Sequence, residues 1–148
     1  MSHQIEKTAL VMHSAQRMFE LVNDVARYPD FLPWCEGTEI HEQTELELMA
    51  SLQVAKGGVR QRFTTRNQLR APDVIDMTLV DGPFRNLSGH WKFLALDENA
   101  CKVLLRLEFE LSNSLSKMAF GAVFSQAANT MVDAFCRRAD VVYGERVL

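Results

Sequence analysis

Few side chains in this sequence have the types and spacing that catalysis needs. The four histidines are scattered along the chain, and His90 has the outward parity of its expected strand. The three cysteines (Cys35, Cys101 and Cys136) lack CxxC spacing, so we expect reduced and mostly buried thiols. No HExxH, GxSxG or glycine-rich phosphate loop is present. We therefore expect no catalytic residue, no metal ligand and no required cofactor.

Two segments place apolar side chains where turns are usually polar. Residues 31–34 include Phe31, Leu32 and Trp34, and residues 82–84 include Pro83 and Phe84. Turns normally favour glycine, proline, asparagine, aspartate and serine. Each segment is therefore expected either to pack against the sheet or to form a gate over the mouth of a cavity.

The elements that position these groups follow from hydrophobic periodicity. Residues 5–12 predict a strand, and Ser14 is expected to cap the first of two short helical pieces. From residue 35 to residue 112 the period is two, and short turns predict six antiparallel strands in a meander. Gly57 and Gly58 predict a two-residue hairpin. In the strand before this hairpin, Leu46 is expected to share the face of Leu48, and Gly89 in a later strand is expected to mark a bend or bulge.

The last stretch, residues 114–143, predicts one long helix with Ser114 as its N-cap. At ~1.5 Å per residue it would be roughly 45 Å long. Gly121 inside it indicates either simple tolerance or a close approach of helix to sheet. Apolar residues recur at steps of three and four along one face: Phe120, Phe124, Ala127, Met131, Phe135, Ala139 and Val142.

Together these patterns predict an α+β fold. We expect a curved antiparallel sheet of about seven strands around the long C-terminal helix, with two short helices after the first strand and a lined cavity beneath the long helix. At 148 residues the chain is expected to form a single domain, 1–148. Its net charge of −3 argues against nucleic-acid binding by bulk charge. No apolar run approaches the ~18 residues of a membrane span, so we expect a cytoplasmic protein with at most peripheral contact with the inner membrane.

Four motifs resemble the coenzyme Q-binding START-domain family, which is polyketide cyclase-like and whose bacterial branch is described as ribosome association toxins. They are residues 28–35 (YPDFLPWC), 63–67 (FTTRN), 81–84 (DGPF) and 87–93 (LSGHWKF). The resemblance covers nearly the whole chain. It implies the helix-grip fold of START and Bet v 1 proteins, with a hydrophobic tunnel between sheet and helix.

The resemblance also implies two roles. One is binding of ubiquinone or its polyprenyl precursors in support of respiration, and the other is binding of the large ribosomal subunit, which blocks subunit association. Relatives on this fold include cyclases, so a polyketide cyclase-like enzyme is a third alternative. On the sequence alone we favour a chaperone or carrier of a hydrophobic isoprenoid, most of all ubiquinone.

Inward parity selects the residues of the expected tunnel, although each of them could simply be core. Thr65 and Asn67 share the inward parity of Phe63, and either a quinone carbonyl or a neighbouring backbone group could be their hydrogen-bond partner. The expected ligand-binding residues of tunnel and gate are Phe31, Leu32, Trp34, Phe63, Asn67, Met77, Leu79, Pro83, Phe84, Trp91, Phe120, Phe124 and Met131.

A basic row is the candidate ribosome contact. Arg60, Arg62, Arg66 and Arg70 share the outward parity of one strand. They would either meet phosphates of ribosomal RNA or pair across strands with Glu45 or Glu47.

Overall fold

The structure is a computed structural model that describes residues 3–112 and 115–144, and the side chains of residues 115–117 are not described. Two short helices, α1 (Ala15–Asn23) and the 3₁₀ helix η1 (Val25–Asp30), follow the first strand, and α2 spans Leu115–Tyr143. The expected N-cap Ser114 lies outside the described residues. The strands are β1 (His3–Val11), β2 (Cys35–Gln43), β3 (Glu47–Lys56), β4 (Val59–Arg70), β5 (Val74–Asp81), β6 (Phe84–Asp97) and β7 (Ala100–Leu111).

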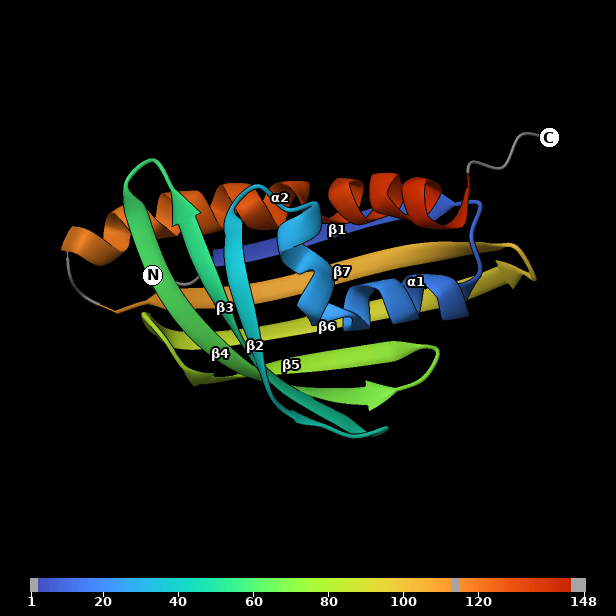
Figure 1. Cartoon of the computed structure of the whole chain (residues 1–148), viewed down its shortest axis with the longest axis horizontal. Coiled ribbons are helices and arrows are strands. Elements are labelled where there is room, and N and C mark those ends of the chain that lie inside the picture. The colour runs from blue at the N-terminus through green and yellow to red at the C-terminus, as the bar shows by residue number, and fades with distance from the viewer. Residues whose placement is uncertain (1–2, 113–114, 145–148) are drawn as a thin grey trace.

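All seven strands form one antiparallel sheet in the order β1-β7-β6-β5-β4-β3-β2. Figure 1 shows β2, β3 and β4 running steeply across the direction of β5, β6, β7 and β1, so the sheet is strongly curved. The long helix α2 contacts β1, β7, β4 and α1. The predicted architecture, a curved seven-stranded sheet around one long C-terminal helix, is confirmed.

Local sequence explains the main boundaries. The Ser14 hydroxyl accepts a hydrogen bond from the Arg17 backbone N–H at 3.1 Å, which caps α1 as expected. Gly57 and Gly58 adopt φ values of 58° and 82°, the positive values that a tight hairpin between β3 and β4 requires. Inward residues of β4 are buried and its outward arginines are not, so period two sets which face of this strand meets the core.

The prediction for Leu46 is wrong, and of the two alternatives for Gly89, a bend or a bulge, the bulge is contradicted. Leu46 is 75% exposed and precedes β3, because the Thr44 hydroxyl accepts hydrogen bonds from the Leu46 and Glu47 backbone N–H groups and turns the chain there. Gly89 is not a bulge, since the register shifts of β6 lie near its two ends. A Cβ at Gly89 would overlap the terminal methyl of Met77, so glycine at this position makes room for a neighbouring side chain.

Gly121 marks a close approach of α2 to the sheet. A Cβ on this glycine would overlap Cδ1 of Leu111 at the end of β7. Of the two alternatives for Gly121, close packing is therefore the one observed. The expected apolar face of α2 is also confirmed except at Val142, which is 49% exposed.

Candidate functional site

An interior cavity of about 60 Å³ lies between α2 and the curled part of the sheet. Its lining residues are mostly apolar, and their polar side-chain groups are those of Thr65 and Asn67, the hydroxyl of Tyr28 and the indole N–H groups of Trp34 and Trp91. The lining residues are Val25, Tyr28, Trp34, Ala50, Leu52, Phe63, Thr65, Asn67, Met77, Leu87, Trp91, Leu105, Leu107, Phe124, Ala127, Ala128 and Met131.

The structure brings about half of the expected tunnel residues to this cavity. They are Trp34, Phe63, Asn67, Met77, Trp91, Phe124 and Met131. Phe120 is fully buried but packs among other phenylalanines, and Leu79 is half-buried on β5 against the core. Neither Phe120 nor Leu79 lies on the cavity wall.

Several wall residues were not selected from the sequence, although Ala127 lies on the expected apolar face of α2. Ala127 and Ala128 are small residues on the buried side of α2, and Ala50 is one on β3. Tyr28 and Val25 come from η1, whose position over the sheet is not encoded in any periodicity. Leu105 could have been identified from its inward parity on β7.

The cavity is small for ubiquinone, the ligand expected from the sequence. A volume of 60 Å³ corresponds to the share of about two water molecules in the liquid, and an apolar cavity that binds benzene is about 150 Å³. A quinone ring would therefore fit only after side chains of the wall move. Met77 and Met131, which are flexible, are the wall residues best able to do so.

The segment at residues 82–84 packs into the core. Phe84 is 5% exposed, and its ring lies 4.9 Å from that of Phe124 and 5.4 Å from that of Phe120, measured between centroids. A Cβ on Gly82 would lie 2.6 Å from Cβ of Phe63, so glycine at this position allows the segment to lie directly against β4. Neither Pro83 nor Phe84 lines the cavity, so packing is the alternative observed for this segment.

The segment at residues 31–34 lies at the cavity wall and also at the surface. Leu32 and Trp34 are buried, whereas Phe31 is half-buried and packs on the ring of Phe135 at 5.2 Å. The carbonyl of Trp34 accepts a hydrogen bond from the Ala55 N–H at 2.9 Å, so the backbone here is tied to β3. Of the two apolar segments, only this one reaches the cavity, through Trp34.

Thr65 and Tyr28, two of the polar residues of the wall, donate hydrogen bonds to other groups of the protein. The Thr65 hydroxyl donates to the Asn67 side-chain oxygen at 3.0 Å. The Tyr28 hydroxyl donates to the carbonyl of Val22, and burial raises the pKa of Tyr28 well above its ordinary value. Tyr28 is the sole titratable residue on the described wall, and it stays protonated at neutral pH. The cavity therefore offers hydrogen bonds rather than acid–base chemistry.

The basic row on the outer face of β4 is ion-paired throughout. Arg60, Arg62 and Arg70 lie 3.3, 2.6 and 3.4 Å from carboxylates, and Arg66 pairs with two of them. The hydrogen bond from Arg62, followed by its charge, lowers the pKa of Glu39. The acidic partners are Glu36, Glu39, Glu42, Glu47 and Asp76.

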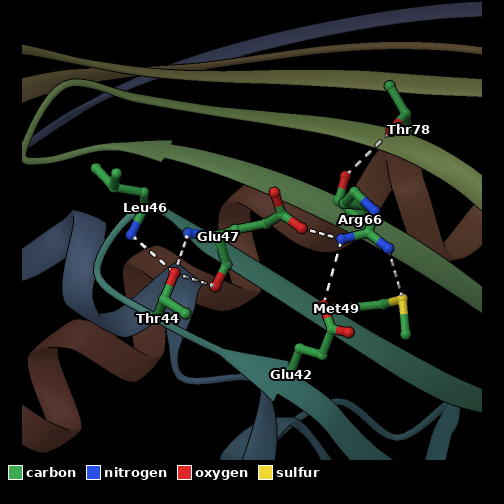
Figure 2. A network of polar contacts seen from close by, with 7 residues as sticks. All are labelled: Glu42, Thr44, Leu46, Glu47, Met49, Arg66 and Thr78. Atoms are coloured by element: carbon green, nitrogen blue, oxygen red, sulfur yellow. Dashed lines mark hydrogen bonds and ion pairs between the residues drawn. The ribbon is translucent and has the colours of Figure 1, made fainter.

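Figure 2 shows how Arg66 reaches two strands away. Arg66 faces Met49 on β3, which in turn faces Glu42 on β2, so the three side chains form one row across the sheet. The guanidinium donates to the Met49 sulfur at 3.3 Å and to Glu42 at 3.4 Å, and it also pairs with Glu47. Pairing with Glu47 was one of the expected alternatives. Glu45, the other expected partner, forms none of the ion pairs found among the described residues.

The histidines lie away from the cavity. His90 is on the outer face, where its Nδ1 lies 2.6 Å from the Asp76 carboxylate. His13 Nε2 lies 2.7 Å from the carboxylate of Asp140 and joins the start of α1 to the end of α2. Among residues 3–112 and 115–144, no cluster of three acidic, histidine or cysteine side chains could hold a metal ion.

The three thiols are free and protonated. Cys35 and Cys101 are buried and Cys136 is half-buried. Burial raises the pKa of Cys35, Cys101 and Cys136 to about 11. A thiolate is the reactive form, so these cysteines are poor nucleophiles at neutral pH. In the described part of the chain, no helix is long and apolar enough to cross a membrane.

Comparison with known proteins finds close relatives along nearly the whole chain. Ribosome association toxin RatA of Vibrio cholerae is 54% identical over 142 residues, which cover 96% of this chain and 99% of the relative. The protein of the same name from Pseudomonas aeruginosa is 51% identical and covers 97% of this chain and 100% of the relative. The mitochondrial coenzyme Q-binding protein COQ10 of Drosophila melanogaster is a distant relative, 26% identical, covering 87% of this chain and 55% of the relative.

A crystal structure of the Zhui aromatase/cyclase from a Streptomyces species has a TM-score of 0.83 at 21% identity and covers 99% of this chain and 100% of its own. At that identity the likeness shows the fold alone. The family described as polyketide cyclase/dehydrase and lipid transport matches residues 11–136. Because that match spans most of the chain, this protein belongs to the polyketide cyclase/dehydrase and lipid transport family.

Proposed function

We propose that this protein associates with the large ribosomal subunit and blocks its joining to the small subunit. The observation that carries the proposal is the identity of 54% and 51%, over 96% and 97% of this chain, to two proteins named ribosome association toxin. The sequence alone favoured a quinone carrier, and the relatives now give the ribosome the stronger support.

The geometry is compatible with a protein that acts by binding. Apart from Tyr28, which is held protonated, the described wall of the cavity carries no titratable side chain. The outer sheet face, in contrast, presents exposed arginines and carboxylates in alternation. Such a face suits a large polar partner, since complementary charges set specificity and association rate.

The test is sucrose-gradient sedimentation with purified ribosomal subunits. We expect the protein to migrate with the large subunit, and we expect the fraction of joined ribosomes to fall as the protein approaches stoichiometric amounts. Protein that stays at the top of the gradient, together with an unchanged fraction of joined ribosomes, would contradict the proposal.

A second candidate function is binding of a hydrophobic isoprenoid, with ubiquinone or a polyprenyl precursor as the ligand. It is favoured by the apolar cavity and by the hydrogen-bonding pair Thr65 and Asn67 on its wall. Each CH₂ group removed from water contributes about 0.8 kcal/mol, so a prenyl tail would favour such a cavity without further polar contacts. Native mass spectrometry of protein purified from its own host should show a co-purifying quinone, and recovery of empty protein alone would argue against this function.

A further inference from the structure

A surface groove of about 270 Å³ adjoins the interior cavity. One side of the groove is formed by the segment at residues 31–34, and the other side is formed by the face of α2 that carries Val123, Ala127 and Ala134. Most of these side chains are apolar, as in sites that bind the body of a small molecule.

Two residues belong to both the groove and the cavity. Trp34 and Ala127 line each of them, so they form the partition between the outside groove and the interior. The backbone of Trp34 is fixed by the hydrogen bond from the Ala55 N–H to its carbonyl. The side chain of Ala127 is a single methyl group, so it has no rotamer to change. A change in the rotamer of the Trp34 side chain would connect the two spaces without a movement of either main chain.

The charges on the groove have one sign. Lys56, at the end of β3, and Arg137, on α2, both line it, and its described lining includes no carboxylate. Both side chains are exposed, and neither forms an ion pair with any residue that the structure describes. The arginines of the β4 row differ, since each of them has an acidic partner.

We propose that this groove binds a single-chain amphiphile with an anionic head. Lys56 and Arg137 hold the carboxylate or phosphate of the head by charge-assisted hydrogen bonds. The hydrocarbon chain of the ligand lies against the apolar side chains of residues 31–34 and continues past Trp34 into the cavity. This inference rests on the second candidate function, the binding of a hydrophobic molecule, and narrows its ligand to one with an acidic head, in place of ubiquinone, whose head is neutral.

The test compares decanoate with decanol, which share a chain and differ in the head. Isothermal titration calorimetry of the whole protein should show tighter binding of decanoate. Lys56→Gln and Arg137→Gln should each weaken decanoate binding about three- to tenfold, the effect of one exposed charge-assisted hydrogen bond. Decanol binding should not change in either variant.

Lys102→Gln is the matched control, since Lys102 is an exposed lysine on β7 that does not line the groove. This variant should bind decanoate as the unchanged protein does. Equal binding of decanol and decanoate, with no effect of Lys56→Gln and Arg137→Gln combined, would overturn the proposal and leave the hydrophobic-ligand function standing. If neither compound binds the unchanged protein, the groove proposal fails, and the hydrophobic-ligand function is decided separately by whether a quinone co-purifies with the protein.

Discussion

The Thr65 hydroxyl donates a hydrogen bond to the Asn67 side-chain oxygen at 3.0 Å on the wall of the cavity. Both residues are more than nine-tenths buried, at 4% and 7% exposure. They follow one another on the inward face of β4, where the neighbouring inward positions, Phe63 and Leu69, are apolar. A buried polar group costs free energy unless it is paired, so the two side chains depend on each other.

Replacing one member of this pair should therefore cost more than replacing both. In Asn67→Leu the Thr65 hydroxyl loses its acceptor, and we expect the free energy of unfolding to fall by about 1–3 kcal/mol. Adding Thr65→Val should restore part of that loss, because no buried hydroxyl then remains. Urea denaturation of the two single variants and the double variant measures this coupling. Strictly additive losses would mean that the two side chains do not rely on each other.

Phe84 should matter for stability and not for ligand binding. Its ring packs against Phe63, Phe120 and Phe124, and Phe84 itself does not line the cavity, although Phe63 and Phe124 do. Phe84→Ala should lower the free energy of unfolding by about 3–5 kcal/mol, as is usual for a buried phenylalanine. Thermal and urea unfolding measure this loss. Phe31→Ala, at a half-buried ring, is the comparison and should cost clearly less, and equal losses would contradict the difference in packing.

The fold could be predicted because its signals are local. Alternation along β4 and β7, the turn at Gly57 and Gly58, and the three- and four-residue steps of α2 each report on neighbouring residues only. Leu46 was misplaced for a similar reason. It continues the alternation of β3, but the hydrogen bonds to Thr44 that Figure 2 shows turn the backbone before the strand begins.

The site could be predicted only in part, because its shape depends on contacts distant in sequence. Inward parity places Met77 and Trp91 near α2, but it does not say that Phe84 fills the core at one end while the cavity remains at the other. The pairing of Arg66 with Glu42 was equally hidden. It needs the register shift between Ile40 and Glu42 on β2, and a bulge has no signature in the alternation of the neighbouring strands.

Stability should fall at alkaline pH. Burial raises the pKa of Cys35, Cys101 and Cys136 to about 11, above the ordinary value of about 8.5. Between these values the unfolded chain releases thiol protons that the folded chain keeps, so the free energy of unfolding decreases as pH rises. The stability that the buried thiols contribute is fully present below the pKa of the thiols in the unfolded chain, about 8.5. Buried Tyr28, whose pKa is also raised, extends the loss above about pH 10.

Urea denaturation at a series of pH values from neutral to about pH 10.5 measures this decrease. Cys101→Ala is the control variant, because Cys101 is completely buried and contributes one of the raised thiols. Its stability should fall less steeply with pH than that of the unchanged protein. A flat profile for the unchanged protein would mean that the folded and unfolded thiols share one pKa.

The outer arginines should contribute to ribosome binding if they exchange their carboxylate partners for RNA phosphates. Arg62→Gln combined with Arg66→Gln should weaken co-sedimentation with the large subunit. It should also reduce the slope of log affinity against log salt by roughly 1.5, the effect of two lost phosphate contacts. Glu42→Gln should act in the opposite direction, since it removes a carboxylate that competes for Arg66. Sucrose gradients at two salt concentrations measure both effects.

Arg106→Gln is the control that distinguishes a contribution of the β4 arginines to ribosome binding from a contribution of other arginines on the outer face. Arg106 lies on β7, is 62% exposed and pairs with Glu6 at 3.2 Å, so it is an ion-paired surface arginine like those of the row. Its replacement should leave sedimentation unchanged if phosphates are bound at the row alone. Equal effects of Arg106→Gln and of the double variant would indicate a response to overall charge, and no effect of the double variant would exclude the row as the contact. Ligand binding in the cavity should be the same in all of these variants, because the arginines lie on the opposite face of the sheet from the lining residues.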